Sequence, residues 1–209
     1  MCPSASAASP RPVRRAGFSL IELLVVLAFM SIALGLCIPA MLNALTRSKL
    51  TSFVQQVGTA MQGARIEAVK RSTVARVEVH FVDNSVIAWV PAGTDTVYTP
   101  GIDFLVMQVK APSGVVLQGP GPASATNMNA VYNFDSISGG GVAYFNSDGS
   151  VQKQGGFRFR DKRDNIMEAF VSPQASARVA VRKYAGNPTG GDDPTKYFES
   201  DEQPGWTWN

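Results

Sequence analysis

The stretch "RRAGFSLIELLVVLAFMSIALGLCIP", residues Arg14–Pro39, decides how this chain is interpreted. Two arginines open it, and the apolar run that follows contains one charged residue, Glu22. No further charge occurs before Arg47, so the run is long enough for the helix of ~20 residues that crosses a bilayer core. The preceding positive charge predicts a cytoplasmic N-terminus. A carboxylate in such surroundings is costly, and we expect it to have a specific partner.

Three export signals share parts of this pattern, and each fails at one point. A twin-arginine signal needs an uninterrupted apolar region, which Glu22 breaks. A lipoprotein signal needs a small residue before its cysteine, but the bulky Leu36 precedes Cys37. An ordinary secretory signal has an apolar region of ~7–15 residues, and this run is longer. A generic single-span anchor, in turn, gives no reason for Glu22 or for the Gly17-Phe18 pair.

The segment Gly17–Pro39 resembles the class III signal of type IV pilins and type II secretion pseudopilins. The resemblance implies cleavage between Gly17 and Phe18 by a membrane aspartyl peptidase, followed by N-methylation of Phe18. It also implies that Glu22 pairs with the new N-terminal amine of an adjacent subunit in a filament. Pro39 lacks a backbone donor, so we expect the helix to kink or loosen before it. A carboxylate that extends toward the lipid headgroups is the alternative role for Glu22.

The helical pattern continues past the apolar run. Apolar residues recur there at spacings of three and four, at Leu50, Phe53, Val54, Val57, Met61, Ala64 and Ala68. We expect one long helix from about Phe18 to about Arg71. Its amphipathic second half needs an apolar partner, which we expect to be a sheet.

The rest of the chain predicts strands and turns. In "ARVEVHFV", residues 75–82, apolar and polar side chains alternate with the period of a half-buried strand, and "VIAWV" pairs back on it after the turn 83–85. Further strands are expected at residues 104–109, 115–118, 132–134, 142–146, 156–160, 167–172 and 178–184. Residues 146–150, "NSDGS", predict a turn, and residues 119–127 and 138–141 predict surface loops.

Two segments of the body extend the resemblance to the GspH/FimT type of minor pilin. "ARIEAVKR", residues 64–71, is similar to the end of the helix in that family, and "VAYFNSDGSV", residues 142–151, is similar to its late hairpin. The closing strand departs from the pattern, because Ala177-Arg178 stands where a Gly-Arg pair is usual.

The expected fold class is therefore α+β. In this pilin fold a long N-terminal helix, transmembrane in its first half and amphipathic in its second, packs on an antiparallel β-sheet domain. We expect a leader peptide at 1–17, a transmembrane and assembly helix at 18–45, a periplasmic globular domain at 46–185 and a loosely ordered acidic tail at 186–209.

The sequence gives no sign of catalysis. The motifs of metalloproteases, serine hydrolases and nucleotide-binding loops are absent, and Cys2 and Cys37 are the only cysteines. The single histidine, His80, lies on the outward face of an expected strand, where we expect a solvated or satisfied side chain. We therefore expect no enzyme activity, no cofactor and no metal site.

Basic residues near the closing strand are candidates for DNA binding. Some FimT-type minor pilins bind incoming DNA through this region, and the candidate residues here are Arg158, Arg160, Arg178, Arg182 and Lys183. If the two strand faces that carry them coincide, they form a basic patch that could neutralise phosphates. Ala180 stands where a second arginine of the family motif would fall, and the tail that follows is acidic. We therefore do not favour DNA as the partner.

The sequence predicts a minor pilin or pseudopilin that assembles through its N-terminal helix into a type II secretion pseudopilus or a type IV pilus. The expected partners are other pilin subunits, the prepilin peptidase and methylase, and an inner-membrane assembly platform. The expected location is the bacterial inner membrane, as a single-pass protein that enters a periplasmic or extracellular filament. The alternatives are a DNA-binding subunit in natural transformation and a processed signal followed by a soluble periplasmic domain.

Overall fold

The computed structural model describes residues 19–94, 96–121, 129–184 and 206–208, without the side chains of 36–44, 46 and 206–208. The chain divides into two compact units, Met1–Asn43 and Ala44–Asn209. Helix α1 (Leu20–Arg71) begins in the first unit and ends in the second, and it continues through Pro39. Gly17 and Phe18, the expected cleavage site, lie outside the described residues.

The expected fold class needs correction. Among the residues that the structure describes, no helix combines the length and the apolar character that crossing a bilayer requires. The long N-terminal transmembrane helix packed on a sheet is therefore wrong, and so is the single-pass inner-membrane location derived from it. The strands of the antiparallel β domain form two sheets, a division that the sequence did not predict.

The first sheet has five strands in the order β3-β2-β1-β7-β6. The second sheet has six strands. Five of them follow one another in the order β11-β10-β9-β8-β4, and the sixth, β5, pairs with β8. All pairs are antiparallel, as expected. The strands are β1 (Ala75–His80), β2 (Ser85–Val90), β3 (Phe104–Lys110), β4 (Val115–Leu117), β5 (Val131–Tyr132), β6 (Asp135–Ile137), β7 (Gly140–Phe145), β8 (Gly155–Asp161), β9 (Ile166–Val171), β10 (Val179–Tyr184) and β11 (Trp206–Trp208).

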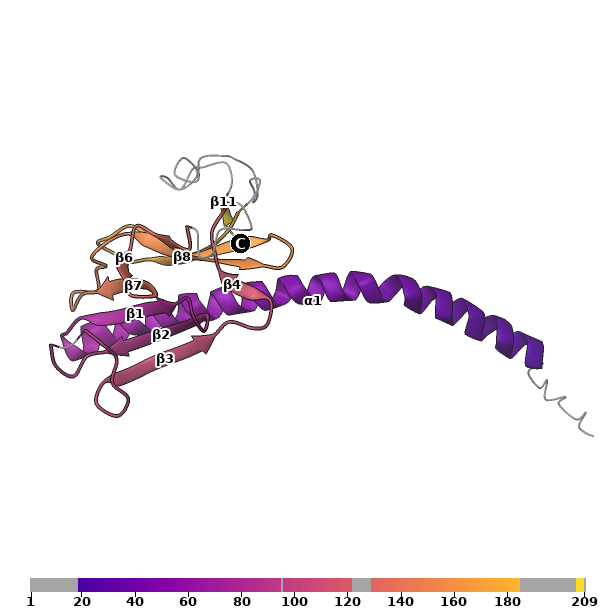
Figure 1. Cartoon of the computed structure of the whole chain (residues 1–209), viewed down its shortest axis with the longest axis horizontal. Coiled ribbons are helices and arrows are strands. Elements are labelled where there is room, and N and C mark those ends of the chain that lie inside the picture. The colour runs from indigo at the N-terminus through magenta and orange to yellow at the C-terminus, as the bar shows by residue number, and fades with distance from the viewer. Residues whose placement is uncertain (1–18, 95, 122–128, 185–205, 209) are drawn as a thin grey trace, which may run out of the picture. The chain divides into compact units, whose positions relative to one another are not determined.

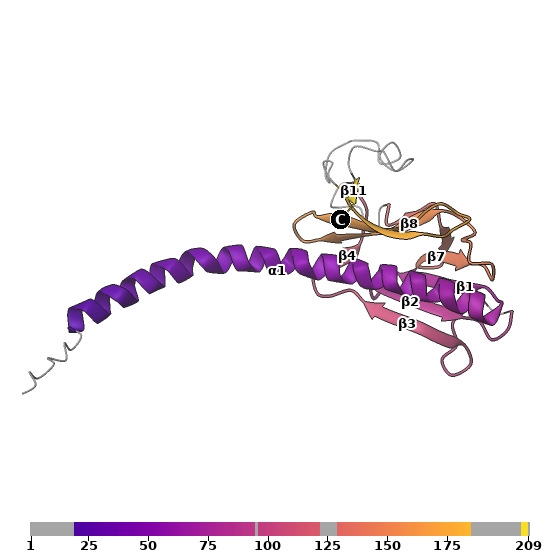
Figure 2. The same ribbon diagram turned by 180° about the vertical axis from the view of Figure 1, so that it is seen from behind.

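The second half of α1 lies between the two sheets, as both views of the molecule show (Figure 1, Figure 2). The helix buries the stripe that its spacing predicted, from Leu50 to Ala68. Phe53 meets Phe159 of β8 edge to face, with ring centroids 5.0 Å apart. Toward the other sheet, Gly63 lies against Val106 of β3. The hydrophobic core therefore contains residues of the helix and of both sheets. The apolar stripe of α1 is broad enough to pack against both sheets.

Most predicted strands are confirmed within a residue or two, and the turn at 146–150 is confirmed by the hydrogen bonds of Asn146 and Asp148 to Ser150. The loop predicted at 138–141 is partly wrong. Gly139 turns the chain with φ of 75°, but Gly140 and Gly141 belong to β7. A Cβ on Gly140 would lie 1.7 Å from the Val79 carbonyl oxygen, so the close approach of β1 requires glycine there. Strands β6 and β11 were not predicted.

Candidate functional site

The candidate DNA-binding arginines lie mostly inside the protein. Arg158 of β8 and Arg182 of β10 both stand opposite Glu168 of β9, on the face of the second sheet that points away from α1. The strand faces that carry the two arginines therefore coincide. Each of the three residues is at most 5% exposed. Glu168 thus lies between Arg158 and Arg182, at the place where the sequence suggested a basic patch for phosphates.

The contacts of Glu168 join the two arginines. Its Oε1 atom accepts a hydrogen bond from Arg158 Nε at 2.9 Å, and its Oε2 atom lies 3.2 Å from Arg182 Nη2. Arg158 also donates from Nη1 to the Asn129 carbonyl oxygen at 3.1 Å. Burial lowers the pKa of Arg158, although Glu168 opposes the shift. An arginine keeps its charge under such conditions, so the group is an internal ion-pair cluster.

Aromatic rings complete this cluster. The guanidinium of Arg158 lies 4.6 Å from the ring centroid of Tyr132, and that of Arg182 lies 3.3 Å from the ring centroid of Phe170. The two rings stack on each other with centroids 6.4 Å apart. Guanidinium groups held over aromatic faces and paired with a carboxylate are well satisfied without an external anion.

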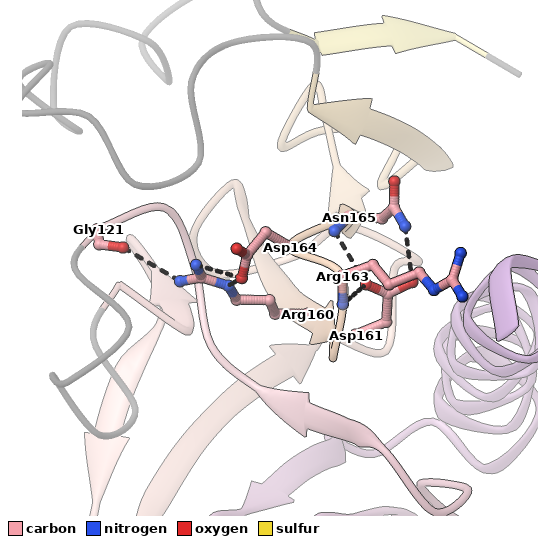
Figure 3. A network of polar contacts seen from close by, with 6 residues as sticks. All are labelled: Gly121, Arg160, Asp161, Arg163, Asp164 and Asn165. Carbon is pink, nitrogen blue, oxygen red and sulfur yellow. Dashed lines mark hydrogen bonds and ion pairs between the residues drawn. The ribbon is translucent and has the colours of Figure 1, made fainter. Parts of the chain in front are cut away.

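Arg160 is held in a second polar network, at the turn between β8 and β9 (Figure 3). Its Nε donates to Asp164 Oδ1 at 2.8 Å, and its Nη1 donates to the Gly121 carbonyl oxygen at 3.1 Å. In the same turn, Asp161 accepts hydrogen bonds from the backbone N–H groups of Arg163 and Asn165. Asp164 has φ of 64°, in the left-handed region, and the carboxylates of Asp161 and Asp164 accept the hydrogen bonds that hold this turn. Arg160 is 2% exposed and is occupied by these contacts.

Two of the five candidate residues reach the surface. Arg178 is exposed in the segment before β10 and lines a hollow with Arg65 and Ile66 of α1. Lys183 is half-buried and lines a different hollow, with Arg47 of α1. The structure therefore brings Arg158 and Arg182 together but around a carboxylate, and it assigns the remaining candidates to three other places.

Sequence reasoning missed Glu168, although a signal was present. The strand "IMEAFV" is buried throughout, and Glu168 is its only charged residue. A strand covered on both faces is normally an apolar run, so a single charge within it predicts a buried partner. Which residue supplies that partner depends on the register of three strands, and this register is not encoded locally.

A second buried carboxylate, Glu78, lies on β1. Burial raises its pKa, while His80, Trp89 and Arg76 act in the opposite direction. His80 Nε2 lies 3.6 Å from Glu78 Oε2, and the guanidinium of Arg76 lies between the rings of Trp89 and Tyr144. His80 therefore has a polar partner on its own strand. Within the described residues no three of His, Cys, Asp and Glu form a group that could hold a metal ion.

The N-terminal part of α1 presents a different kind of surface. Its large apolar side chains are exposed on every side of the helix, from Leu20 at 78% through Leu27 at 54% to Leu34 at 61%. Glu22 is the one charged side chain among the residues described there, and its backbone N–H is capped by Ser19 Oγ at 3.2 Å. A helix that is apolar all round requires covering by other apolar groups.

Comparisons with known proteins leave the relationship of the chain open: no family model, no curated protein and no solved structure matches it.

Proposed function

We propose that this chain is a pilin-like minor subunit that assembles with other subunits through the apolar N-terminal part of α1. The assembly is a filament of the type IV pilus or type II secretion pseudopilus kind, and the β-rich second unit is presented on it. The work of the protein is then mechanical: it supports pilus assembly or protein secretion.

The exposed apolar surface of residues 20–34 carries this proposal. Side chains such as Leu24, Phe29 and Ile32 are each more than half exposed. Each fully buried side chain of this size contributes about 1.5–3 kcal/mol, so packing these helices against one another supplies a large driving force. The sequence around Gly17, Phe18 and Glu22 supports the same proposal through its resemblance to the class III signal. The buried state of Arg158, Arg160 and Arg182 gives no support to the DNA-binding alternative.

A pair of matched substitutions tests the assembly role. Leu27→Glu places a charge on the N-terminal part of α1, whereas Ile66→Glu places one at a comparably exposed position in the second unit, 54% against 64%. We expect Leu27→Glu to abolish co-sedimentation with wild-type chain in filament preparations and Ile66→Glu to preserve it. Equal co-sedimentation of both variants would refute assembly through the helix.

The cellular role is tested by deleting the gene and measuring protein secretion, twitching and DNA uptake side by side. We expect loss of secretion or of twitching, restored by the wild-type gene and by Ile66→Glu but not by Leu27→Glu. Loss of DNA uptake alone, with secretion and twitching intact, would favour the DNA-binding alternative.

A further inference from the structure

The strands at the edges of the two sheets differ in length. Among the described strands, the first sheet ends at β3 and β6, and the second ends at β4, β11 and the two-residue β5. Strands β4, β6 and β11 have three residues each, whereas β3 has seven. Short edge strands are a common means of preventing unwanted pairing with other chains. Strand β3 is the long exception among them.

The composition of β3 also favours pairing. The strand contains no proline, and its single charged residue is Lys110 at its end. Phe104 and Leu105 are 41% and 40% exposed, although both are large apolar residues. Apart from one register shift opposite Ala88, the strand has none of the usual features that protect an edge.

The register identifies the backbone groups that face the open edge of β3. The Ala111 N–H donates to the Asn84 carbonyl oxygen, which makes these two residues a hydrogen-bonded pair. Hydrogen-bonded and non-hydrogen-bonded pairs alternate in an antiparallel ladder, so the backbone groups of Gln108 and Lys110 point away from β2. Beyond the register shift the alternation resumes, and Leu105 is the next residue of this kind.

We propose that the open edge of β3 pairs antiparallel with β3 of a second copy of this chain, about a two-fold axis at Gln108. Gln108 then stands opposite Gln108 of the other copy, and Leu105 stands opposite Lys110. Val106 is the extra residue of β3 at the register shift. In the dimer, Val106 and Met107 of each copy stand together opposite Val109 of the other, so the two-fold axis relates the two bulges. All three outward-facing residues of each strand are used.

Charge favours the antiparallel arrangement over a parallel one. In a parallel pair of identical strands the two Lys110 side chains would be neighbours, and like charges that stand side by side are destabilising. In the antiparallel pair each Lys110 lies beside Leu105 of the other copy, at opposite ends of the interface. The pairing uses the second unit alone and does not depend on assembly through α1.

Cysteine cross-linking of the full chain tests the register. In a background with Cys2→Ser and Cys37→Ser, we expect Gln108→Cys to form a disulfide dimer on mild oxidation, because a hydrogen-bonded pair has Cα atoms ~5.5 Å apart, within the range of disulfides. Leu105→Cys is the matched control. Its own copy is about four ladder steps away along the strand, or ~14 Å, so it should not cross-link alone. Leu105→Cys combined with Lys110→Cys should restore the dimer.

A proline tests the backbone hydrogen bonds separately. Gln108→Pro removes an N–H that faces the edge and leaves the bonds to β2, whereas Gln108→Ala keeps that N–H. We expect Gln108→Pro to lower dimerisation at least tenfold by sedimentation in detergent, with an unchanged circular dichroism spectrum, and Gln108→Ala to dimerise like wild type.

Three results would overturn the pairing: no dimer with Gln108→Cys, an equally efficient dimer with Leu105→Cys alone, or a cross-link in cells to a different protein in place of a second copy. Adding Leu27→Glu separates this proposal from assembly through α1. The Gln108→Cys dimer should persist in that variant even though filament co-sedimentation is lost.

Discussion

Glu168 Oε1 lies 2.9 Å from Arg158 Nε in a site where both side chains are at most 2% exposed. The same carboxylate lies 3.2 Å from Arg182, so one side chain of β9 joins its two neighbouring strands. Two cations and one anion are thereby buried together. The removal of charges from water is costly, and the cluster is tolerated only because each charge has close partners.

Glu168→Gln should therefore be severely destabilising. The substitution keeps the shape of the side chain but leaves the buried charges of Arg158 and Arg182 without their counter-charge. Breaking a buried pair in this way costs about 3–5 kcal/mol. We expect a loss of this size in the free energy of unfolding, measured by urea denaturation of the full chain.

Asp164→Asn supplies the comparison for that experiment. Asp164 also pairs with a buried arginine, Arg160, but its own side chain is 43% exposed. Water compensates an exposed partner, so we expect a cost of at most about 1 kcal/mol. An equal loss in the free energy of unfolding for Asp164→Asn and Glu168→Gln would show that the buried cluster contributes no more to stability than the exposed ion pair does.

The sequence predicted the strands well because their patterns are local. The alternation in residues 75–82 and the spacing from Leu50 to Ala68 each reflect burial against one neighbouring layer. The division into two sheets was not predicted, because no local pattern states whether β7 pairs with β1 or with β8. The same limit applies to the site: Arg158, Glu168 and Arg182 are each visible in the sequence, but their meeting depends on non-local register.

In the apolar run a strong local pattern led to a wrong prediction. Its composition predicted a membrane span, yet the described part of α1 does not provide one. Strands β6 and β11 were missed because a three-residue segment has no readable period, whereas β4, of the same length, carries the apolar run that predicted it.

Glu78 should make stability depend on pH. Burial raises its pKa above the ordinary 4.5, so the folded protein holds this proton more tightly than the unfolded chain does. The contribution of Glu78 to stability is then complete below about pH 4.5 and is lost as pH rises through the raised pKa. Glu78→Gln imitates the protonated form and should remove this loss.

We expect the free energies of unfolding of wild type and Glu78→Gln to agree at low pH and to diverge as pH rises, with the variant more stable. Urea denaturation of both proteins across this interval measures the difference. A difference that is constant with pH would contradict the assignment to Glu78.

Phe53 should be a main contact between α1 and the second sheet. It is 2% exposed and meets Phe159 edge to face. Phe53→Ala removes this ring and leaves a cavity, and such substitutions cost about 3–5 kcal/mol. Thr59→Ala, at an exposed position of the same helix, should change the free energy of unfolding by no more than about 0.5 kcal/mol. Thermal denaturation of the two variants gives the comparison.

Glu22 should matter for assembly and not for folding. Among the residues whose side chains the structure describes, the core of the second unit begins at Leu50, so Glu22→Ala should leave its unfolding transition unchanged. In the proposed filament the carboxylate pairs with the N-terminal amine of an adjacent subunit, within a layer of apolar helices where a charge pair is little screened. Loss of only ~1.4 kcal/mol lowers an association constant tenfold, so we expect at least a tenfold fall in the fraction of variant that enters filaments with wild-type chain. Glu67→Ala is the control, since Glu67 is a carboxylate of the same helix that already pairs with Lys70 and Arg71 within its own chain. Normal incorporation of Glu22→Ala, measured by quantitative immunoblotting of sedimented filaments, would show that the carboxylate has no docking role.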